Sequence, residues 1–562
     1  MARVESKPVL IVGAGPAGLI AALSLAKLGI PVRIVEKLHA FHNSTRGTGT
    51  QPRSLEIYRF LGLLDDYLHA AQTMPPARAY KLPGGTEPLK TWMIVEPMSS
   101  TPDRPFLGEP RIVLGQYRLE GIFRDHLAKH GVQIEVATEL MHFDQDDDGV
   151  TATLRKNGEE LEEARVAYVI GADGARGVTR KLIGATFEGQ TMEGDGGVWA
   201  DVELEGLSPD YWHVWIQPAA IVLVRAIGDV GRFHVGIIGR HFDTTHLAEP
   251  DKFVDSIYEH TQRRDLKFKK FLAISYWKPQ MRMVNKLRSG RAFLVGDVAH
   301  VHSPTGGQGL NTSIQDSFNL AWKLALVYKG LASSKLLESF EIERLPVIAQ
   351  MLSATTALYK DVMTVQGQQS GAAQSVMTGF PQWHDTSLAQ LDINYRWSPI
   401  VYDARGNGGL DDTALKARAY TGYPGEPVHA GDRAPDAPGL VDASGKESRL
   451  HDIFKPTIHT ILIFSSDPGN AKKEIDSIVQ AVRSLPEGTI QIVVLGSHDV
   501  PKPGDHDGVP TYKDAEGYAF RTYNIQDGKV TVVGVRPDGY VGTIVDDATG
   551  LQTYFSRIFR GF

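Results

Sequence analysis

A glycine-rich turn near the amino terminus, Gly13-Ala14-Gly15-Pro16-Ala17-Gly18, has the spacing that suits binding of a pyrophosphate. The first glycine permits a tight turn, the second lets the backbone approach the anion, and the third allows close packing of helix on strand. The helix that follows would offer unpaired N–H groups and the positive end of its dipole. Glu36 lies eighteen residues after Gly18, where a carboxylate can accept hydrogen bonds from ribose hydroxyls. This pattern predicts a dinucleotide site, although the glycines alone would also fit a simple turn.

Two later segments also end an apolar run with an acidic turn. Asp173-Gly174 follows a strand-like run and stands beside Arg176 and Arg180. Gly296-Asp297 ends a second run and leads into a glycine-rich stretch. That stretch contains Pro304, Gly306, Gly307, Gly309, Leu310 and Asn311. Each segment alone would also fit an ordinary strand-to-loop turn.

In this order and spacing, the three segments resemble the fingerprints of the FAD-dependent aromatic hydroxylases, the group A flavoprotein monooxygenases. The resemblance extends over nearly the whole chain and is strongest to the phenol hydroxylase-like branch. It implies that Asp297 bonds the ribityl chain of FAD. It also implies that Gly307, Gly309, Leu310 and Asn311 face the flavin ring from a helix amino terminus, which suits the negative charge of reduced flavin. One departure is Gly177, where the family usually has serine.

Two polar residues match further cofactor positions of the family. Arg46 lies in the segment 45–53, which resembles a flavin-contacting loop, and Gln116 matches a position near the ribityl-diphosphate. Both would also fit as surface polar residues. His300 and His302 form an HxH pair with no third ligand nearby, so we expect no metal site.

The resemblance implies a monooxygenase that hydroxylates a phenolic ring. NADPH or NADH would reduce FAD, and O2 would then react through a flavin C4a-hydroperoxide. No second GxGxxG in a βαβ context is present, which suits a family without a separate nicotinamide domain. Three alternatives stay open: a larger polyketide-type or polycyclic phenol, oxidative decarboxylation of a hydroxybenzoate, and a flavin-binding assembly protein without activity.

Candidates for substrate activation lie on an expected strand of the middle region. Arg232-Phe233-His234 stands where phenol hydroxylase-like enzymes have Arg-Phe-Tyr, so His234 would replace the tyrosine. Imidazole exchanges a proton near neutral pH, and Arg232 and His234 share one face of a strand. The acid that the family carries in its early loop corresponds to Thr48 here. Arg232, His234 and Pro304 are therefore the catalytic candidates, and a structural role is the alternative for His234.

The periodicity around these motifs predicts an α/β protein. A strand at residues 9–12, a helix to residue 28 and a strand at 32–36 form a βαβ unit. A β-rich pattern over residues 196–238 indicates an inserted antiparallel sheet. The resemblance implies that it is the substrate sheet of a Rossmann-like FAD-binding domain, and that the last part of the chain, with the family-like run 535–541, is a thioredoxin-like α/β domain. The expected boundaries are 1–185 and 282–366 for the FAD-binding domain, 186–281 for the insertion, 367–427 for a helical or linker region, and 428–562 for the last domain.

Composition limits the remaining possibilities. With 59 basic and 66 acidic residues the net charge is −7, and the charges are spread out, which argues against nucleic acid and membrane partners. The chain has no cysteine, so its thioredoxin-like domain cannot exchange disulfides. By resemblance that domain is structural and supports a homodimer. A cysteine-free chain fits the cytoplasm. The apolar run 17–28 is too short to span a bilayer and is expected to be the first helix.

Overall fold

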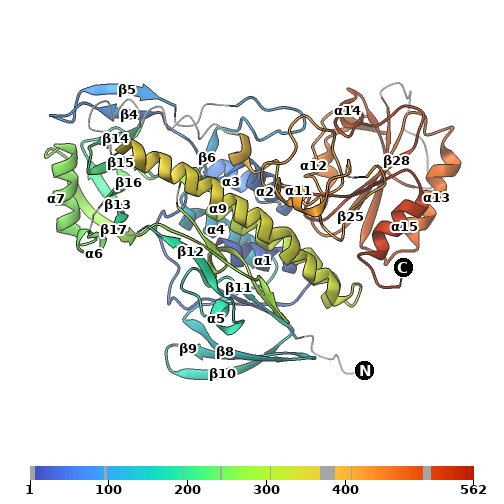
Figure 1. Cartoon of the computed structure of the whole chain (residues 1–562), viewed down its shortest axis with the longest axis horizontal. Helices are drawn as coiled ribbons and strands as arrows, with labels where there is room; N and C mark the ends of the chain where they lie inside the picture. Colours follow the sequence, from blue (N-terminus) through green and yellow to red (C-terminus); the bar gives the residue numbers. More distant parts are fainter. Residues whose placement is uncertain are drawn as a thin grey trace.

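The protein consists of three bodies arranged in a row, as the computed structural model shows (Figure 1). The structure describes residues 7–93, 98–192, 194–240, 243–303, 305–366, 386–406, 408–497 and 508–561. A nucleotide-binding domain lies in the middle, with an antiparallel sheet on one side and a carboxyl-terminal α/β domain on the other.

The middle domain is organised around a six-stranded sheet of order β19-β20-β11-β1-β2-β7. Its strands are β1 (Val9–Val12), β2 (Val32–Val35), β7 (Ile134–Glu135), β11 (Tyr168–Gly171), β19 (Arg288–Ser289) and β20 (Ala292–Leu294). All pairings are parallel except that of β19 with β20. Every residue of β1 is buried, as expected for a central parallel strand covered on both faces. Helix α1 (Pro16–Lys27) connects β1 to β2, which confirms the predicted βαβ unit.

Two long helices follow the last parallel strand. Helix α8 (Gly309–Tyr328) packs against α1, and α9 (Glu338–Gln366) runs across the middle domain towards the antiparallel sheet (Figure 1). Apolar residues at positions 55, 58, 61 and 64 predict one helix over residues 54–68, but the structure has two, α2 (Pro52–Leu61) and α3 (Leu64–Ala70). The break falls at Gly62, whose φ of 73° is left-handed and ends a helix at little steric cost.

The inserted sheet has seven strands in the order β17-β13-β16-β15-β14-β4-β5. They are β4 (Ala77–Tyr80), β5 (Pro88–Trp92), β13 (Asp195–Glu205), β14 (Trp212–Ile216), β15 (Ala220–Ala226), β16 (Arg232–Arg240) and β17 (Lys267–Trp277). One face packs on α7 (Pro250–Thr261) through an apolar cluster that includes Val198, Val235 and Phe253. Strands β4 and β5 come from residues 77–92, outside the range expected for the insertion, and pair with β14 in parallel through β4.

The carboxyl-terminal domain contains an eight-stranded sheet of order β22-β29-β28-β25-β26-β27-β23-β24. Its strands are β22 (Tyr402–Asp403), β23 (Leu440–Asp442), β24 (Glu447–Ser448), β25 (His459–Ser465), β26 (Ile490–Gly496), β27 (Thr511–Asp514), β28 (Thr531–Val535) and β29 (Val541–Val545). Helices α13 (Lys472–Arg483) and α15 (Ala548–Ser556) pack together beside it. The predicted α/β order of this domain is confirmed.

The segment expected as a linker is partly folded into the protein. Residues 367–385 of that expected region lie outside the described residues. Beyond them, Tyr395, Trp397 and Tyr420 are buried in an apolar cluster with Met351 of α9. Aromatic burial of this kind explains why the Gly- and Pro-rich sequence is nevertheless held in place.

Buried ion pairs join the carboxyl-terminal domain to the middle domain. The two terminal nitrogens of Arg536 donate to the two carboxylate oxygens of Glu343 on α9 at 2.7 and 2.9 Å. Lys323 of α8 donates to the same carboxylate at 2.7 Å. All three side chains are fully buried, and the two cations hold the pKa of Glu343 below its usual range despite its burial.

Replacing Glu343 with glutamine should therefore destabilise the whole protein. Removing the anion leaves Lys323 without its carboxylate partner in a buried site and leaves Arg536 with Asp538 alone, which costs about 3–5 kcal/mol. Thermal unfolding followed by circular dichroism measures the loss. The control is Asp452→Asn, which breaks the exposed pair with Arg59 and should cost about 1 kcal/mol or less. Equal unfolding temperatures for the two variants would contradict this assignment.

Candidate flavin site

The glycine turn after β1 leaves an open space at its centre. A Cβ on Gly13, whose φ is +105°, would lie 2.4 Å from the carbonyl oxygen of Ala172. A Cβ on Gly18 would lie 1.9 Å from the carbonyl oxygen of Gly13. By contrast, a Cβ on Gly15 would meet no atom within 4 Å. The outer two glycines are thus required by packing, and Gly15, at the start of α1, is left open to a ligand.

Glu36 is fixed beside this turn at the end of β2. Its carboxylate accepts hydrogen bonds from the backbone N–H groups of Ala14 and Leu38, each at 3.0 Å. Carboxylate oxygens have further lone pairs, so Glu36 can still accept from a ribose. The structure therefore brings Glu36 and the glycine turn together, as the spacing predicts.

The two acidic turns lie at the ends of neighbouring strands but point their carboxylates differently. Asp173, after β11, accepts hydrogen bonds from the backbone N–H of Thr179 at 3.0 Å and from the Thr179 hydroxyl. A Cβ on Gly177 would lie 2.3 Å from the carboxyl carbon of Asp173. Asp173 therefore occupies the space that a serine at position 177 would need, and it stabilises its own loop.

Asp297, after β20, instead reaches solvent. Its side chain is exposed although its neighbours Gly296 and Val298 are buried. Surrounding protein nevertheless raises the pKa of Asp297 by desolvation, with His300 and Arg46 acting in the opposite sense. A side chain that is both exposed and surrounded by protein lies in a recess, where it can bond a hydroxyl of a bound ligand.

Arg180 holds the two acidic turns together. Its guanidinium donates to the carbonyl oxygens of Ala175 and Val298, both at 2.9 Å, and lies 4.0 Å from the ring of Phe187. The sequence places Arg180 near the first turn, but its bond to the second turn depends on the parallel pairing of β11 with β20. This positioning role could not be inferred from the motif.

The loop before α8 is clamped to the loop that carries Arg46. Asn311 donates from its side-chain amide to the carbonyl oxygens of Gly49 and Gly307 at 3.0 and 2.7 Å. It also accepts from the backbone N–H of Gln51 at 2.8 Å. Because the polar atoms of its side chain are used within the protein, the side chain of Asn311 positions the two loops. Pro304, the third catalytic candidate, lies outside the described residues.

The other predicted cofactor residues gather at the same loops. Arg46 is exposed, and its backbone is left-handed with a φ of 40°, so the loop turns at this residue. Gln116, at the start of α4 (Gln116–Ala128), accepts from the backbone N–H of Gly47 at 3.4 Å. Leu310 also lies beside Gly47, since its Cδ1 would be 3.7 Å from a Cβ at that position. Gly307 has a φ of 64° and open space around it, whereas a Cβ on Gly309 would lie 2.7 Å from Nε2 of His302, so Gly309 is required by the packing of that ring.

These residues fit FAD. The open position at Gly15, the acceptor Glu36 and the exposed Asp297 match a pyrophosphate, a ribose and a ribityl chain in that order. Arg46 and the amino terminus of α8 supply positive potential where reduced flavin is negative.

The first histidine of the HxH pair, His300, has a structural role. His300 Nε2 bonds the carboxylate of Asp316 at 2.8 Å, and Asp316 also accepts from Arg344 at 2.8 Å. Within the described ranges, no three His, Asp or Glu side chains cluster as metal ligands would.

The two catalytic candidates of the inserted sheet, His234 and Arg232, have different surroundings. His234 is buried, and its Nδ1 bonds Asp201 Oδ1 at 2.6 Å. Asp201 Oδ2 also accepts from the backbone N–H of Thr45 at 2.6 Å, which connects the sheet to the loop of Arg46. Arg232 instead pairs with Asp229 at 3.0 Å at the end of the strand, and its side chain is 38% exposed. The structure therefore brings His234, but not Arg232, to the flavin loops.

Two residues that the sequence analysis did not select accompany His234. Asp201 on β13 and Arg225 on β15 stand directly opposite His234 on β16 in the sheet register. Trp199 stacks on the imidazole with ring centroids 4.8 Å apart. Burial and the nearby Arg225 lower the pKa of His234, and Asp201 opposes them. Strand alternation places such residues on one face, but only the register between three strands identifies the group.

The fold and site define an FAD-binding flavoprotein, and comparison with known proteins agrees. Residues 6–355 match the FAD binding domain family, and residues 498–561 match the phenol hydroxylase C-terminal dimerisation domain. The chain belongs to the flavin-dependent aromatic monooxygenases of this FAD-binding family, as the resemblance predicts.

Individual relatives extend over most of the chain. The 6-methylpretetramide 4-monooxygenase of Streptomyces rimosus is 33% identical over 99% of this chain and 94% of its own. The pentachlorophenol 4-monooxygenase of Sphingobium chlorophenolicum is 29% identical over 81% of this chain and 79% of its own. The solved structure of aklavinone-11 hydroxylase with FAD and aklavinone superposes with a TM-score of 0.75 at 25% identity, over 99% of both chains. In the part of this chain that the structure describes, no helix is both long enough and apolar enough to cross a bilayer.

Replacing Gly15 with valine should weaken FAD binding without affecting folding. The backbone there has φ −77° and ψ −177°, which valine adopts readily, and the space around a Cβ is empty. The side chain would occupy the place of the diphosphate and remove charge-assisted hydrogen bonds, so the Kd should rise about tenfold or more. Titration of the apoprotein with FAD, followed by quenching of flavin fluorescence, measures this.

Gly13→Ala is the matched comparison for this prediction. Its Cβ would clash with Ala172, so that variant should lose folding stability as well as FAD. Unchanged FAD affinity in Gly15→Val would place the diphosphate elsewhere.

Proposed function

We propose that this enzyme uses NADPH or NADH and O2 to hydroxylate a phenolic ring held between the flavin loops and the inserted sheet. The observation that carries the proposal is the direct bonding of these two parts. Asp201 of the sheet accepts from Thr45, and Arg225 of the sheet donates to Thr48, two residues of the loop that carries Arg46. A polar, aromatic-lined face is thereby fixed against the loop that is expected to contact FAD.

The residues for FAD follow from the site. Gly13, Gly15 and Gly18 would receive the pyrophosphate, Glu36 the ribose and Asp297 the ribityl chain. Arg46, Gln116, Gly307, Gly309 and Leu310 would surround the flavin ring, with Asp173 and Asn311 holding the loops. Bound FAD supplies the redox chemistry and the activation of O2, while the protein orients the substrate and excludes water.

His234 would receive the proton of the phenol. Its lowered pKa keeps the imidazole neutral at physiological pH, so it can act as an acceptor. Asp201 accepts a hydrogen bond from Nδ1 of His234, which leaves Nε2 of His234 for the substrate. Loss of the phenolic proton makes the ring a better nucleophile, which assists hydroxylation.

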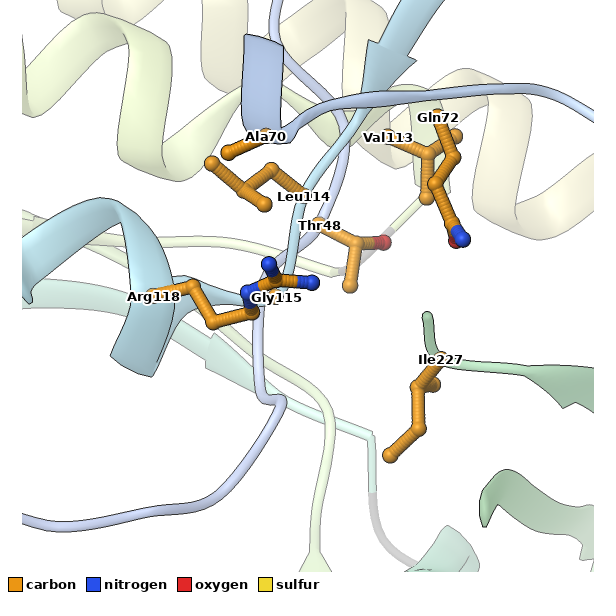
Figure 2. A pocket seen from close by; sticks show the side chains of 8 residues that line it. All are labelled: Thr48, Ala70, Gln72, Val113, Leu114, Gly115, Arg118 and Ile227. Carbon is orange, nitrogen blue, oxygen red and sulfur yellow. The ribbon is translucent and has the colours of Figure 1, made fainter. Parts of the chain in front are cut away.

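A small hollow beside the flavin loop has room for about one water molecule. Ala70, Val113, Leu114 and Ile227 form its apolar walls, and Thr48, Gln72 and Arg118 supply polar groups (Figure 2). A simple phenol, and still more a larger polyketide-type phenol, the second candidate, would have to widen this hollow to bind here. Relatives that act on pentachlorophenol and on 6-methylpretetramide support both sizes.

The proposal includes a homodimer in the cytoplasm. The match of residues 498–561 to a dimerisation domain supports the dimer. The absence of cysteine from the chain supports a reducing compartment.

A panel of phenols, hydroxybenzoates and polycyclic phenols tests the function. We expect a phenolic substrate to accelerate NADPH or NADH oxidation and to yield hydroxylated product in proportion to the O2 consumed. Loss of a ring carboxylate would indicate oxidative decarboxylation instead. A protein that binds FAD but shows no substrate-stimulated oxidation with any compound would be a binding protein, and the proposal would fail.

The His234→Gln variant should hydroxylate about 10²- to 10⁴-fold more slowly, because glutamine cannot accept the phenolic proton. FAD binding should be unchanged, since His234 contacts Asp201 and Trp199 of the sheet. In the native enzyme the rate should fall as pH drops below the usual range of histidine, because the lowered pKa keeps His234 neutral above it. Product formation measured against pH checks both points. An unchanged rate and unchanged coupling of NADPH use to product would remove His234 from the mechanism.

A further inference from the structure

Arg225 is a buried cation whose hydrogen bonds are incomplete. Its residue is only 4% exposed. One terminal nitrogen donates to the Thr48 hydroxyl, whereas Nε and Nη1 have no partner among the residues that the structure describes. Burial lowers the pKa of Arg225 to about 10. Unmade hydrogen bonds of a buried charge are costly, so their retention suggests a ligand that completes them.

Among the residues that the structure describes, no carboxylate is dedicated to neutralising this charge. Asp201 is the acid that acts on Arg225, but its two oxygens already accept from His234 and Thr45. The guanidinium instead lies 5.0 Å from the ring of Trp212, whose own N–H is buried without a described partner. From α4, Tyr117 and Arg118 also lie near this group, since the charges of Asp201 and Arg118 both act on the pKa of Tyr117. An anionic oxygen is therefore the ligand that suits Arg225.

Strand register places Arg225 beside His234, the proposed proton acceptor. Asp201 of β13 lies opposite His234 of β16, and His234 lies opposite Arg225 of β15. Trp199 covers Gly236, where a Cβ would lie 2.3 Å from its ring, and stacks on His234. This buried face thus presents an aromatic ring, an imidazole and a guanidinium in succession.

The small hollow lies next to the side-chain partner of Arg225. Thr48 lines the hollow and also accepts the hydrogen bond from Arg225 (Figure 2). Arg118 reaches the same hollow from α4 near Gly115. A phenol that binds Arg225 would therefore have to widen the hollow past Thr48.

We propose that Arg225 binds the phenolate oxygen of the substrate, completing its hydrogen bonds with this anion as the proton passes to Nε2 of His234. This inference rests on the proposed function. In the step, the phenol O–H bond breaks, an N–H bond forms on His234, and the electron pair stays on the oxygen beside Arg225. The site would prefer phenols made acidic by electron-withdrawing substituents, because these give up the proton most readily.

Binding of 4-nitrophenol to the FAD-loaded protein, without NADPH or NADH, tests this directly. Its phenolate absorbs visible light and its phenol form does not, so absorbance against pH gives the pKa of the bound ligand. We expect a decrease of about one unit or more in the native protein, equivalent to about tenfold tighter binding of the phenolate. In Arg225→Met the decrease should disappear, and phenolate affinity should fall about tenfold or more.

Matched variants separate ligand binding from a purely structural role. Arg78→Met removes another arginine of the same sheet, one that stacks 3.4 Å above Tyr211, and should leave the ligand pKa unchanged. Thr48→Val removes the one described hydrogen-bond partner of Arg225, and most of the decrease in the 4-nitrophenol pKa should remain in this variant. Arg225→Met should unfold at the native temperature or above, because it removes an unsatisfied buried charge. If that variant does not fold, Arg225→Gln replaces it, with the same expected loss of the shift.

Three results would overturn the inference. The first is an unshifted pKa of 4-nitrophenol bound to the native protein, and the second is a full pKa shift in the Arg225 variants. The third is an equal loss of the pKa shift in Thr48→Val and Arg225→Met, which would mean that Arg225 only stabilises the loop. Since this assay needs no turnover, failure to hydroxylate would overturn the proposed function while the binding result stands separately.

Discussion

Helix α8 ties the loops around the expected flavin ring to one another and to the last domain. At its first turn, Asn311 clamps the loop of Arg46 to the glycine-rich loop before the helix. One turn later, Asp316 accepts from the backbone N–H of Gly296 and from Arg344. Nearer its end, Lys323 meets the carboxylate shared with the last domain. Buried polar groups must be paired, so these bonds fix the cofactor loops relative to the whole molecule.

The site divides its polar residues between those that complete the protein and those left for ligands. Asp173 and Asn311 use their polar atoms within the chain. Arg225 instead uses only one terminal nitrogen, on Thr48, and leaves Nε and Nη1 without a described partner, while the Asp297 side chain is exposed. Polar residues of the site can thus either hold the protein together or remain available to a ligand. Their hydrogen-bond partners distinguish these two roles better than the sequence motif does.

The sequence was most informative where function depends on local backbone geometry. The glycine turn, Glu36 and the acidic strand ends could be predicted because their requirements lie within one βαβ unit or one turn. Helix α2 ended earlier than expected because one glycine adopted a left-handed conformation. Arg225 and Asp201 could not be found, since strand register across the sheet brings them to His234. For the same reason Arg232, two residues from His234, lies outside the group.

The pairing of β4 with β14 has a consequence for how the substrate sheet must assemble. Residues 77–92 complete that sheet, although more than a hundred residues separate them from its other strands. An excised insertion would expose β14 as a bare edge and uncover Val214 and Ile221, which pack with Ala77. Unprotected edges of this kind invite aggregation. The insertion is therefore not an autonomous module, and a graft between relatives would have to carry both segments.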